Sequence, residues 1–240
     1  MKYLDVVALA KKEIASRTNY CNKHITYRKR CDVWESGNQI NLWTYWQGYQ
    51  LEDIDKNGVD ILLVGQDWGD PEKDKKACVR IKRIQDGDRN AFYLDDNSPT
   101  DKTLIEMFKV LGCDITKRNP GKRLFFTNYS LGYRDGKETG GMTKKLMSMD
   151  SELFDELVNA IHPKIIICLG KLTYEMVSGT VTRDFIKHLQ EGNPFIAPYP
   201  KQPEIRVYGV AHCGARGLSN IGVVEKMIAT WRRIAEDGLC

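Results

Sequence analysis

Four short apolar runs, rich in β-branched residues, recur along the chain, and segments of helical periodicity separate them. The runs cover 60–64, 124–127, 164–169 and 205–210. Their nearly continuous hydrophobicity is typical of parallel strands that are buried on both faces. Apolar residues recur at helical spacing over 4–14, 104–111, 153–161 and 221–234. Strands that alternate with helices predict an α/β fold made of right-handed β-α-β units.

Capping signals indicate where two of these helices begin. Thr100 is the expected N-cap of the helix over 104–111. The next helix is expected to begin at Asp150 or Ser151 and to stop before Pro163, because proline disfavours a helical residue in front of it.

The first 55 residues differ from the rest, because an aromatic and basic stretch follows the first expected helix. We expect a single domain over 1–240, in which 1–55 forms an aromatic-rich N-terminal elaboration. Such a block usually packs on the edge of a sheet, but aromatic rings interleaved with Lys and Arg also stack on nucleic-acid bases. The highly charged segment 69–90 is expected to be a helix or loop inserted after the first strand.

Composition changes this picture little. With 42% apolar and 28% charged residues, the chain resembles an ordinary globular protein. No run reaches the roughly 18 apolar residues that a membrane span needs, and residues 1–14 lack the apolar stretch of a signal peptide. We therefore expect a cytoplasmic monomer without a membrane partner.

The seven cysteines are an odd number without a dense pattern, which indicates a reducing compartment and not a disulfide scaffold. Cys21, His24 and Cys31 lie close together in sequence, but an obvious fourth zinc ligand is missing. We therefore expect no metal at these residues.

The net charge of +4 is unevenly distributed. Basic residues cluster in 23–30, 73–83 and 117–123. Such clusters neutralise nucleic-acid phosphates, but solvated faces balanced by neighbouring acids have the same composition. Charge alone therefore favours nucleic-acid binding only slightly.

Polar side chains follow the expected strands at the point where each strand ends. Asp67 comes after Gly65 and Gln66 at the end of the first strand, Asn128 follows the second, and His212 follows the fourth. The carboxyl ends of parallel strands share one edge, where open α/β sheets bind their ligands. We therefore expect Asp67, Asn128 and His212 to line one pocket. A carboxylate, an amide and an imidazole together are typical of an active site.

In this order and placement, Gly65-Gln66-Asp67, Asn128 and His212 resemble the three motifs of the uracil-DNA glycosylase superfamily. The resemblance is closest to the type whose first motif reads GQDPYH, and it covers about residues 58–236. It implies a three-layer α/β/α fold around a central four-stranded parallel sheet. It also implies a base-excision-repair enzyme, a DNA glycosylase that hydrolyses the N-glycosidic bond of uracil or a related damaged base, with damaged DNA as its partner.

Cleavage of this bond builds positive charge on the sugar and negative charge on the departing base. The resemblance places Asp67 at the sugar, where a carboxylate stabilises the cation and orients the attacking water. It places His212 at the base, as a hydrogen-bond donor to the leaving anion. Asn128 matches the residue that reads the Watson–Crick edge of a flipped base, the backbone of Gln66 donates to the base, and Phe92 resembles the stacking phenylalanine. Because water is the nucleophile, neither a cofactor nor a metal is needed.

Two motifs depart from the family pattern. Trp68 and a glycine replace a Pro-Tyr pair whose Tyr fills the space beside C5 of uracil, so that Trp68 is the candidate for this contact here. After His212, the sequence Cys-Gly-Ala-Arg-Gly-Leu replaces Pro-Ser-Pro-Leu. Arg216 or Leu218 is the candidate to fill the gap left by the flipped base, and Gly214 lets the loop approach a phosphate.

Structural roles remain open for the same residues. Asp67 can cap a helix, Asn128 can satisfy its own backbone in a turn, His212 can be structural, and Phe92 can belong to the core. Two other functions also remain open. One is a non-catalytic protein of this fold that binds DNA or nucleotides. The other is a hydrolase that uses Cys213 beside His212, although adjacent residues of an extended segment point to opposite faces.

Overall fold

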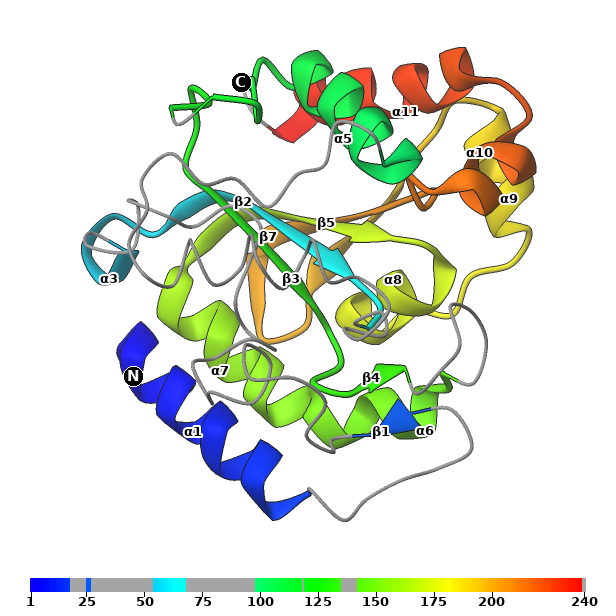
Figure 1. The fold of residues 1–240 in the computed structure, drawn as a ribbon. Coiled ribbons are helices and arrows are strands. Elements are labelled where there is room, and N and C mark those ends of the chain that lie inside the picture. Colours follow the sequence, from blue (N-terminus) through cyan, green and yellow to red (C-terminus); the bar gives the residue numbers. More distant parts are fainter. Residues whose placement is uncertain (18–24, 27–53, 68–97, 118, 135–141, 239–240) are drawn as a thin grey trace. The chain divides into compact units, whose positions relative to one another are not determined.

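The computed structural model describes residues 1–17, 25–26, 54–67, 98–117, 119–134 and 142–238 (Figure 1). Five of its strands form one mixed, mostly parallel sheet in the order β3-β2-β5-β7-β6. The predicted α/β class is confirmed, but the sheet has five strands and not the four that we expected. Among the described residues, no helix is long and apolar enough to cross a membrane.

All four apolar runs form strands. These are β2 (Val59–Gly65), β3 (Leu124–Asn128), β5 (Pro163–Leu169) and β7 (Gln202–Val210). β2 pairs in parallel with β5, and β5 pairs in parallel with β7. Val64, Cys168 and Gly209 consequently lie at one level of the sheet. β2, β3 and β5 are buried along nearly their whole length, which explains why their sequences show no alternation of apolar and polar residues.

The fifth strand, β6 (Phe195–Tyr199), is antiparallel to β7 and lies at the edge of the sheet. Its residues alternate between partly buried and exposed until the buried Tyr199. Pro198 lies within it, which an edge strand tolerates because one side of its backbone needs no partner. Sequence analysis missed β6 because prolines at 194, 198 and 200 interrupt the segment.

Backbone contacts divide the chain into two compact units. Unit 1 comprises Met1–Gly58, Gly65–Tyr93 and Phe125–His162, and unit 2 comprises Val59–Val64, Leu94–Leu124 and Pro163–Cys240. Each unit therefore combines segments that are distant in sequence. All three residues of the Gly65-Gln66-Asp67 motif belong to unit 1, whereas β2 up to Val64 belongs to unit 2.

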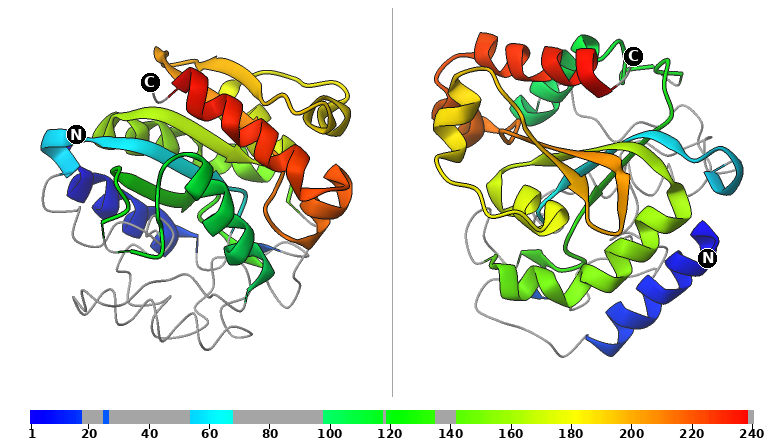
Figure 2. Two further views of the ribbon diagram at one scale, coloured as in Figure 1. Left: turned by 90° about the horizontal axis from the view of Figure 1, so that it is seen from above. Right: turned by 180° about the vertical axis from the view of Figure 1, so that it is seen from behind.

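Unit 2 has three layers (Figures 1 and 2). α8 (Lys171–Ser178) covers one face of β7, where a Cβ on Gly209 would come within 2.6 Å of the Tyr174 ring. α11 (Val224–Gly238) covers the other face, where the Tyr208 hydroxyl donates to Asp237 over 2.6 Å. Successive strand residues point to opposite faces, so the neighbours 208 and 209 place the two helices on opposite sides.

α5 (Pro99–Val110) packs against α11 on the same side of the sheet, and Phe108 meets the fully buried Trp231 edge-on at a centroid distance of 5.5 Å. The expected N-cap of α5 was wrong by two positions. Ser98 caps the helix by accepting from the backbone N–H of Asp101, and Thr100 lies within the first turn. Proline at position 99 explains the difference, because its fixed φ suits the first helical residue.

The predicted helix over 221–234 corresponds to α11 (Val224–Gly238), except at its start. Ile221 is instead the last residue of a separate helix, α10 (Ala215–Ile221), which ends before Gly222 with its φ of 94°. Glycine adopts this conformation without a steric penalty, which allows the chain to change direction. Unit 2 also contains the short α9 (Phe185–Gln190), which has no counterpart in the prediction.

Unit 1 contains α1 (Tyr3–Ser16) and α7 (Ser151–Ile161), which pack against each other. Both helices were predicted. α7 begins at Ser151 and ends at Ile161, and its C-cap residue His162 lies in the left-handed region, directly before proline. Tyr3 meets Phe125 of β3 edge-on at a centroid distance of 5.6 Å.

The smaller elements are α3 (Ile54–Asn57), α6 (Lys144–Met147), η2 (Ser148–Asp150) and the antiparallel pair of β1 (Ile25–Thr26) and β4 (Tyr133–Arg134). The expectations for segment 69–90 and for the aromatic stretch before residue 54 lie outside the described residues.

Asp60 fixes the amino-terminal end of β2 within unit 2. Its carboxylate accepts the backbone N–H of Arg123 over 2.7 Å and pairs with Lys164 over 2.8 Å. Burial acts to raise the pKa of Asp60, but Lys164, the Arg123 N–H and Lys122 outweigh it and hold the pKa below its usual value. The carboxylate therefore stabilises the fold in its charged form.

Asp60→Asn should lower the free energy of unfolding by about 1–2 kcal/mol at neutral pH. The folded-state pKa lies below the unfolded one, so the stabilisation is present above the unfolded value of about 4 and is lost as the pH falls through the folded value. Urea denaturation of the unaltered protein and of Asp60→Asn, at about pH 7 and about pH 3, measures this loss of stability. If the two proteins differ in free energy of unfolding by the same amount at both pH values, the prediction is wrong.

Candidate functional site

The polar segments that follow β2 and β3 are hydrogen-bonded to each other within unit 1. The backbone N–H of Tyr129 donates to the carbonyl of Gly65 over 2.9 Å, and that of Ser130 donates to the carbonyl of Gln66 over 3.1 Å. Pairing therefore continues beyond the last residue of β3, Asn128. Asp67 and Asn128 consequently project from two segments that run side by side.

Asn128 lies directly over Gly65. A Cβ built on this glycine would come within 2.1 Å of the carboxamide Oδ1 of Asn128, a distance that real atoms do not allow. Only glycine fits beneath the carboxamide in this arrangement. Asn128 itself is 8% exposed, so its side chain is held against the sheet and not in solvent.

Gln66 and Asp67 are partly buried. The Nε2 of Gln66 donates to the Oδ2 of Asp67 over 3.4 Å. A partly buried carboxylate of this kind remains accessible to a ligand, and its charge acts more strongly there than in bulk water. The helix-cap alternative for Asp67 concerns the residues that follow it, which lie outside the described part of the chain.

His212 follows β7 in unit 2, and its side chain is exposed. Its Nδ1 accepts the backbone N–H of Gly214 over 2.9 Å. When the ring is neutral, this bond leaves the proton on Nε2, so that Nε2 is a hydrogen-bond donor. A Cβ on Gly217 would lie 1.7 Å from the His212 carbonyl oxygen, so this glycine lets the first turn of α10 close against the residue.

The register of unit 2 places the exits of β2 and β7 at one edge of the sheet. Val64 and Gly209 are both level with Cys168 in the parallel ladder. Asp67 follows Val64 by three residues, and His212 follows Gly209 by the same number. The convergence of Asp67, Asn128 and His212 on one pocket stays a prediction.

The remaining site predictions fall into two groups. Gly214 is buried and is the N-cap residue of α10, whereas Arg216, which is exposed, and Leu218, which is partly buried, lie within this helix. Their contact with DNA stays a prediction. The residues that lie outside the described part of the chain are Trp68, Phe92, Cys21, His24 and Cys31. Within the described part, no group of three or more His, Cys, Asp or Glu side chains is arranged to hold a metal ion.

Cys213 is fully buried beside the exposed His212. Burial raises the pKa of its thiol well above the ordinary value, with a smaller contribution from Asp101. The thiolate is the nucleophilic form of cysteine, and here it is strongly disfavoured. These features argue against the Cys-His hydrolase.

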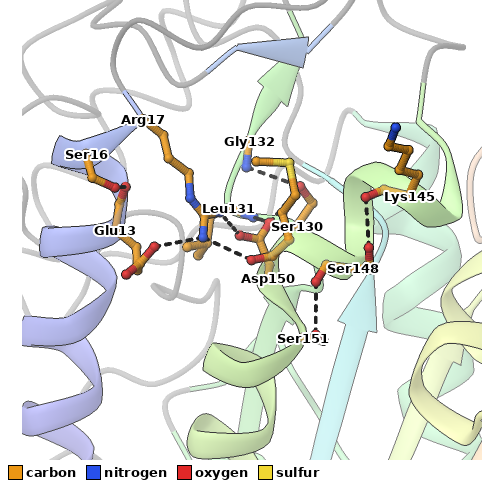
Figure 3. A network of polar contacts seen from close by, with 11 residues as sticks. Glu13, Ser16, Arg17, Ser130, Leu131, Gly132, Lys145, Ser148, Asp150 and Ser151 are labelled. Atoms are coloured by element: carbon orange, nitrogen blue, oxygen red, sulfur yellow. Dashed lines mark hydrogen bonds and ion pairs between the residues drawn. The ribbon is translucent and has the colours of Figure 1, made fainter.

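Sequence analysis treated Asp150 as a helix start and missed its contacts with the turn after β3. At the N-cap position of α7, its carboxylate makes no capping bond and instead contacts Arg17, Ser130 and Leu131 (Figure 3). Burial raises the pKa of Asp150, against the lowering effect of the Leu131 N–H and Arg17. The only sequence signal was an acidic residue before an amphipathic helix, which is typical of an ordinary cap.

No protein-family model matches the chain, and no curated protein matches its sequence significantly. The three short motifs and the chemistry of their residues are therefore the basis for a functional assignment.

Gly65→Ala should destabilise the protein by about 1–3 kcal/mol, because its methyl group collides with the Asn128 carboxamide. In an Asn128→Ala background the collision is absent, so the same change should cost less than about 1 kcal/mol. Urea denaturation of the four proteins of this cycle measures the coupling.

Gly209→Ala is the matched control, because its methyl group collides with the Tyr174 ring and not with Asn128. Its loss of stability should therefore be the same in the unaltered protein and in the Asn128→Ala background. Simple additivity of Gly65→Ala and Asn128→Ala would show that the carboxamide does not occupy this position.

Proposed function

We propose that the protein is a monofunctional DNA glycosylase that hydrolyses the N-glycosidic bond of uracil or a related damaged base in DNA. The observation that carries this proposal is the pairing of the two polar segments after β2 and β3. Their backbone bonds, from Tyr129 to Gly65 and from Ser130 to Gln66, hold a carboxylate and a carboxamide on neighbouring segments. Glycosidic hydrolysis of a flipped base needs these two groups: one for the sugar and one for the base.

Asp67 acts on the sugar. As the bond to the base lengthens, positive charge develops on the sugar ring, and a fixed carboxylate stabilises it. The same carboxylate orients the water that attacks the anomeric carbon. The partly buried position of Asp67 supports this role, because electrostatic stabilisation is stronger where water is partly excluded.

Asn128 reads the base. A carboxamide presents one donor and one acceptor, which complement the adjacent acceptor and donor on the Watson–Crick edge of uracil. Its position over Gly65 limits the motion of the side chain, and restricted motion improves discrimination between bases.

His212 acts on the leaving group. The bond from the Gly214 N–H to Nδ1 favours the tautomer with a proton on Nε2, which can donate to the oxygen of the departing base. A donor at this position stabilises the negative charge that the base carries away. Water completes the reaction, so no cofactor takes part in the proposed chemistry.

The direct test is a screen of oligonucleotides that contain uracil, hypoxanthine, xanthine or a G·T mismatch. The protein is incubated with each, and alkali then breaks the strand at any abasic site. The proposal expects a strand break at one or more of the modified bases. If the protein binds DNA but releases no base, the non-catalytic DNA-binding alternative takes its place.

Asp67→Asn should reduce the single-turnover rate of base release by about 10²–10³-fold, because it removes negative charge at the sugar with little change in size. Affinity for the same oligonucleotide should change by less than about threefold. Asp60→Asn makes the same change at the opposite end of β2 and should leave the rate unaltered. An unchanged rate in Asp67→Asn would refute the proposed mechanism.

Asn128→Asp should reduce uracil release by about 10- to 100-fold, because a carboxylate has no N–H to offer to the base. Cytosine, which presents a donor where uracil presents an acceptor, should become a relatively better substrate. The ratio of the two single-turnover rates is the measurement. If the ratio is the same as in the unaltered protein, Asn128 does not read the base.

A further inference from the structure

We propose that Asp150 and Arg17 form a positioning pair that holds the turn after β3, and through it Asn128, in the conformation that reads the base. The inference rests on the proposed glycosylase function. It adds two residues that lie outside all three motifs, one of them directly after α1.

The Asp150 carboxylate contacts both the turn and Arg17 (Figure 3). Its Oδ2 accepts the backbone N–H of Leu131 over 2.8 Å and the hydroxyl of Ser130 over 3.2 Å. Its Oδ1 accepts from the guanidinium of Arg17. The residue is 1% exposed, so these bonds replace the water that the carboxylate would otherwise bind.

Arg17 is itself fixed in place. Its Nη2 donates to Glu13 over 2.8 Å and to the carbonyl of Met149 over 2.9 Å, while Nη1 donates to Asp150. The guanidinium therefore connects the end of α1 to the residues before α7. Removing it would leave a buried carboxylate without its counter-charge, which is strongly unfavourable.

Three consecutive backbone amides connect this pair to the candidate site. The N–H of Tyr129 donates to Gly65, that of Ser130 donates to Gln66, and that of Leu131 donates to Asp150. The first two bonds fix the register of the site segments, and the third ties the turn to Asp150. Displacement of the turn would therefore displace Asn128, which directly precedes these amides.

The position of Asp150 supports this role. It occupies the N-cap position of α7, where a carboxylate ordinarily accepts an N–H of the first helical turn, yet its side chain makes no capping bond. The carboxylate is thus directed to the turn after β3 and away from its own helix. Ser130 strengthens this turn further, because its Oγ accepts the backbone N–H of Gly132 over 3.2 Å.

The first test uses Asp150→Ala with Asp60→Ala as its matched control. Asp60 is also a carboxylate that accepts a backbone N–H and pairs with a cation, but it lies at the opposite end of β2. The probe is an oligonucleotide with 2′-fluoro-2′-deoxyuridine, which resists cleavage because fluorine disfavours positive charge on the sugar. We measure its dissociation constant and that of the same strand with thymidine.

Preference for the uracil analogue should fall by at least about 10-fold in Asp150→Ala, since displacements of about 1 Å can cost about 100-fold. Affinity for the thymidine strand should stay within about twofold. Asp60→Ala should preserve the preference. An unchanged preference in folded Asp150→Ala would overturn the proposal.

A second set of variants applies if Asp150→Ala does not fold. Arg17→Met leaves the buried carboxylate unpaired and should lower the preference, whereas Arg17→Met combined with Asp150→Asn removes both charges and should restore most of it. Failure of the double variant to improve on Arg17→Met would contradict a positioning role for the pair.

Hydrogen exchange separates this inference from the proposed function. In Arg17→Met, the amides of Tyr129 and Ser130 should exchange at least about 10-fold faster, although neither contacts Arg17 or Asp150 through its N–H. Unchanged exchange would overturn the positioning role whatever the activity. A third outcome is faster exchange in Arg17→Met together with no base release by the unaltered protein. This outcome would show that the pair holds the turn, and it would refute the glycosylase function.

Discussion

The candidate site depends on the close approach between the ends of β2 and β3. Gly65 has no side chain, and the space that a side chain would fill is taken by the carboxamide oxygen of Asn128. The backbone bonds from Tyr129 and Ser130 then extend the pairing past the end of β3. The polar segments are therefore a continuation of a buried sheet and not two independent loops. Groups that must act on charge developing in a transition state benefit from this rigidity, because they need no reorganisation when the reaction occurs.

A buried charge supports the turn that follows β3. Asp150 is enclosed by Arg17, Ser130 and Leu131, and burial without these partners would be costly. Its carboxylate does not cap α7, although its position would allow it to do so. Asp150 is thus remote in sequence from the three motifs. Its carboxylate nevertheless binds the turn that follows Asn128. Under the proposed function, mutation of Arg17 would therefore affect base recognition although Arg17 itself contacts no base.

The sequence predicted the α/β class, the four buried strands and most of the principal helices, because these elements have strong and continuous apolar patterns. It did not predict β6, where prolines interrupt the strand, or the break at Gly222, which depends on a backbone conformation and not on hydrophobicity. Asp67, Asn128 and His212 were identifiable because each lies at or just after the end of a strand. Gly65 was visible as part of a motif, but its contact with Asn128 was not, since steric fit between two strands leaves no periodic signal. The Arg17–Asp150 pair was hidden for the same reason: an ion pair between distant segments has no signature in a single sequence.

The most direct test of the site is a crystal structure of the protein with an oligonucleotide that carries 2′-fluoro-2′-deoxyuridine. The account predicts that the uracil leaves the base stack and places its Watson–Crick edge about 3 Å from the Asn128 carboxamide, with the sugar beside Asp67. His212 should then lie within hydrogen-bond distance of the base. A uracil that remains stacked in the strand, or that binds away from Asn128 and Asp67, would contradict the account.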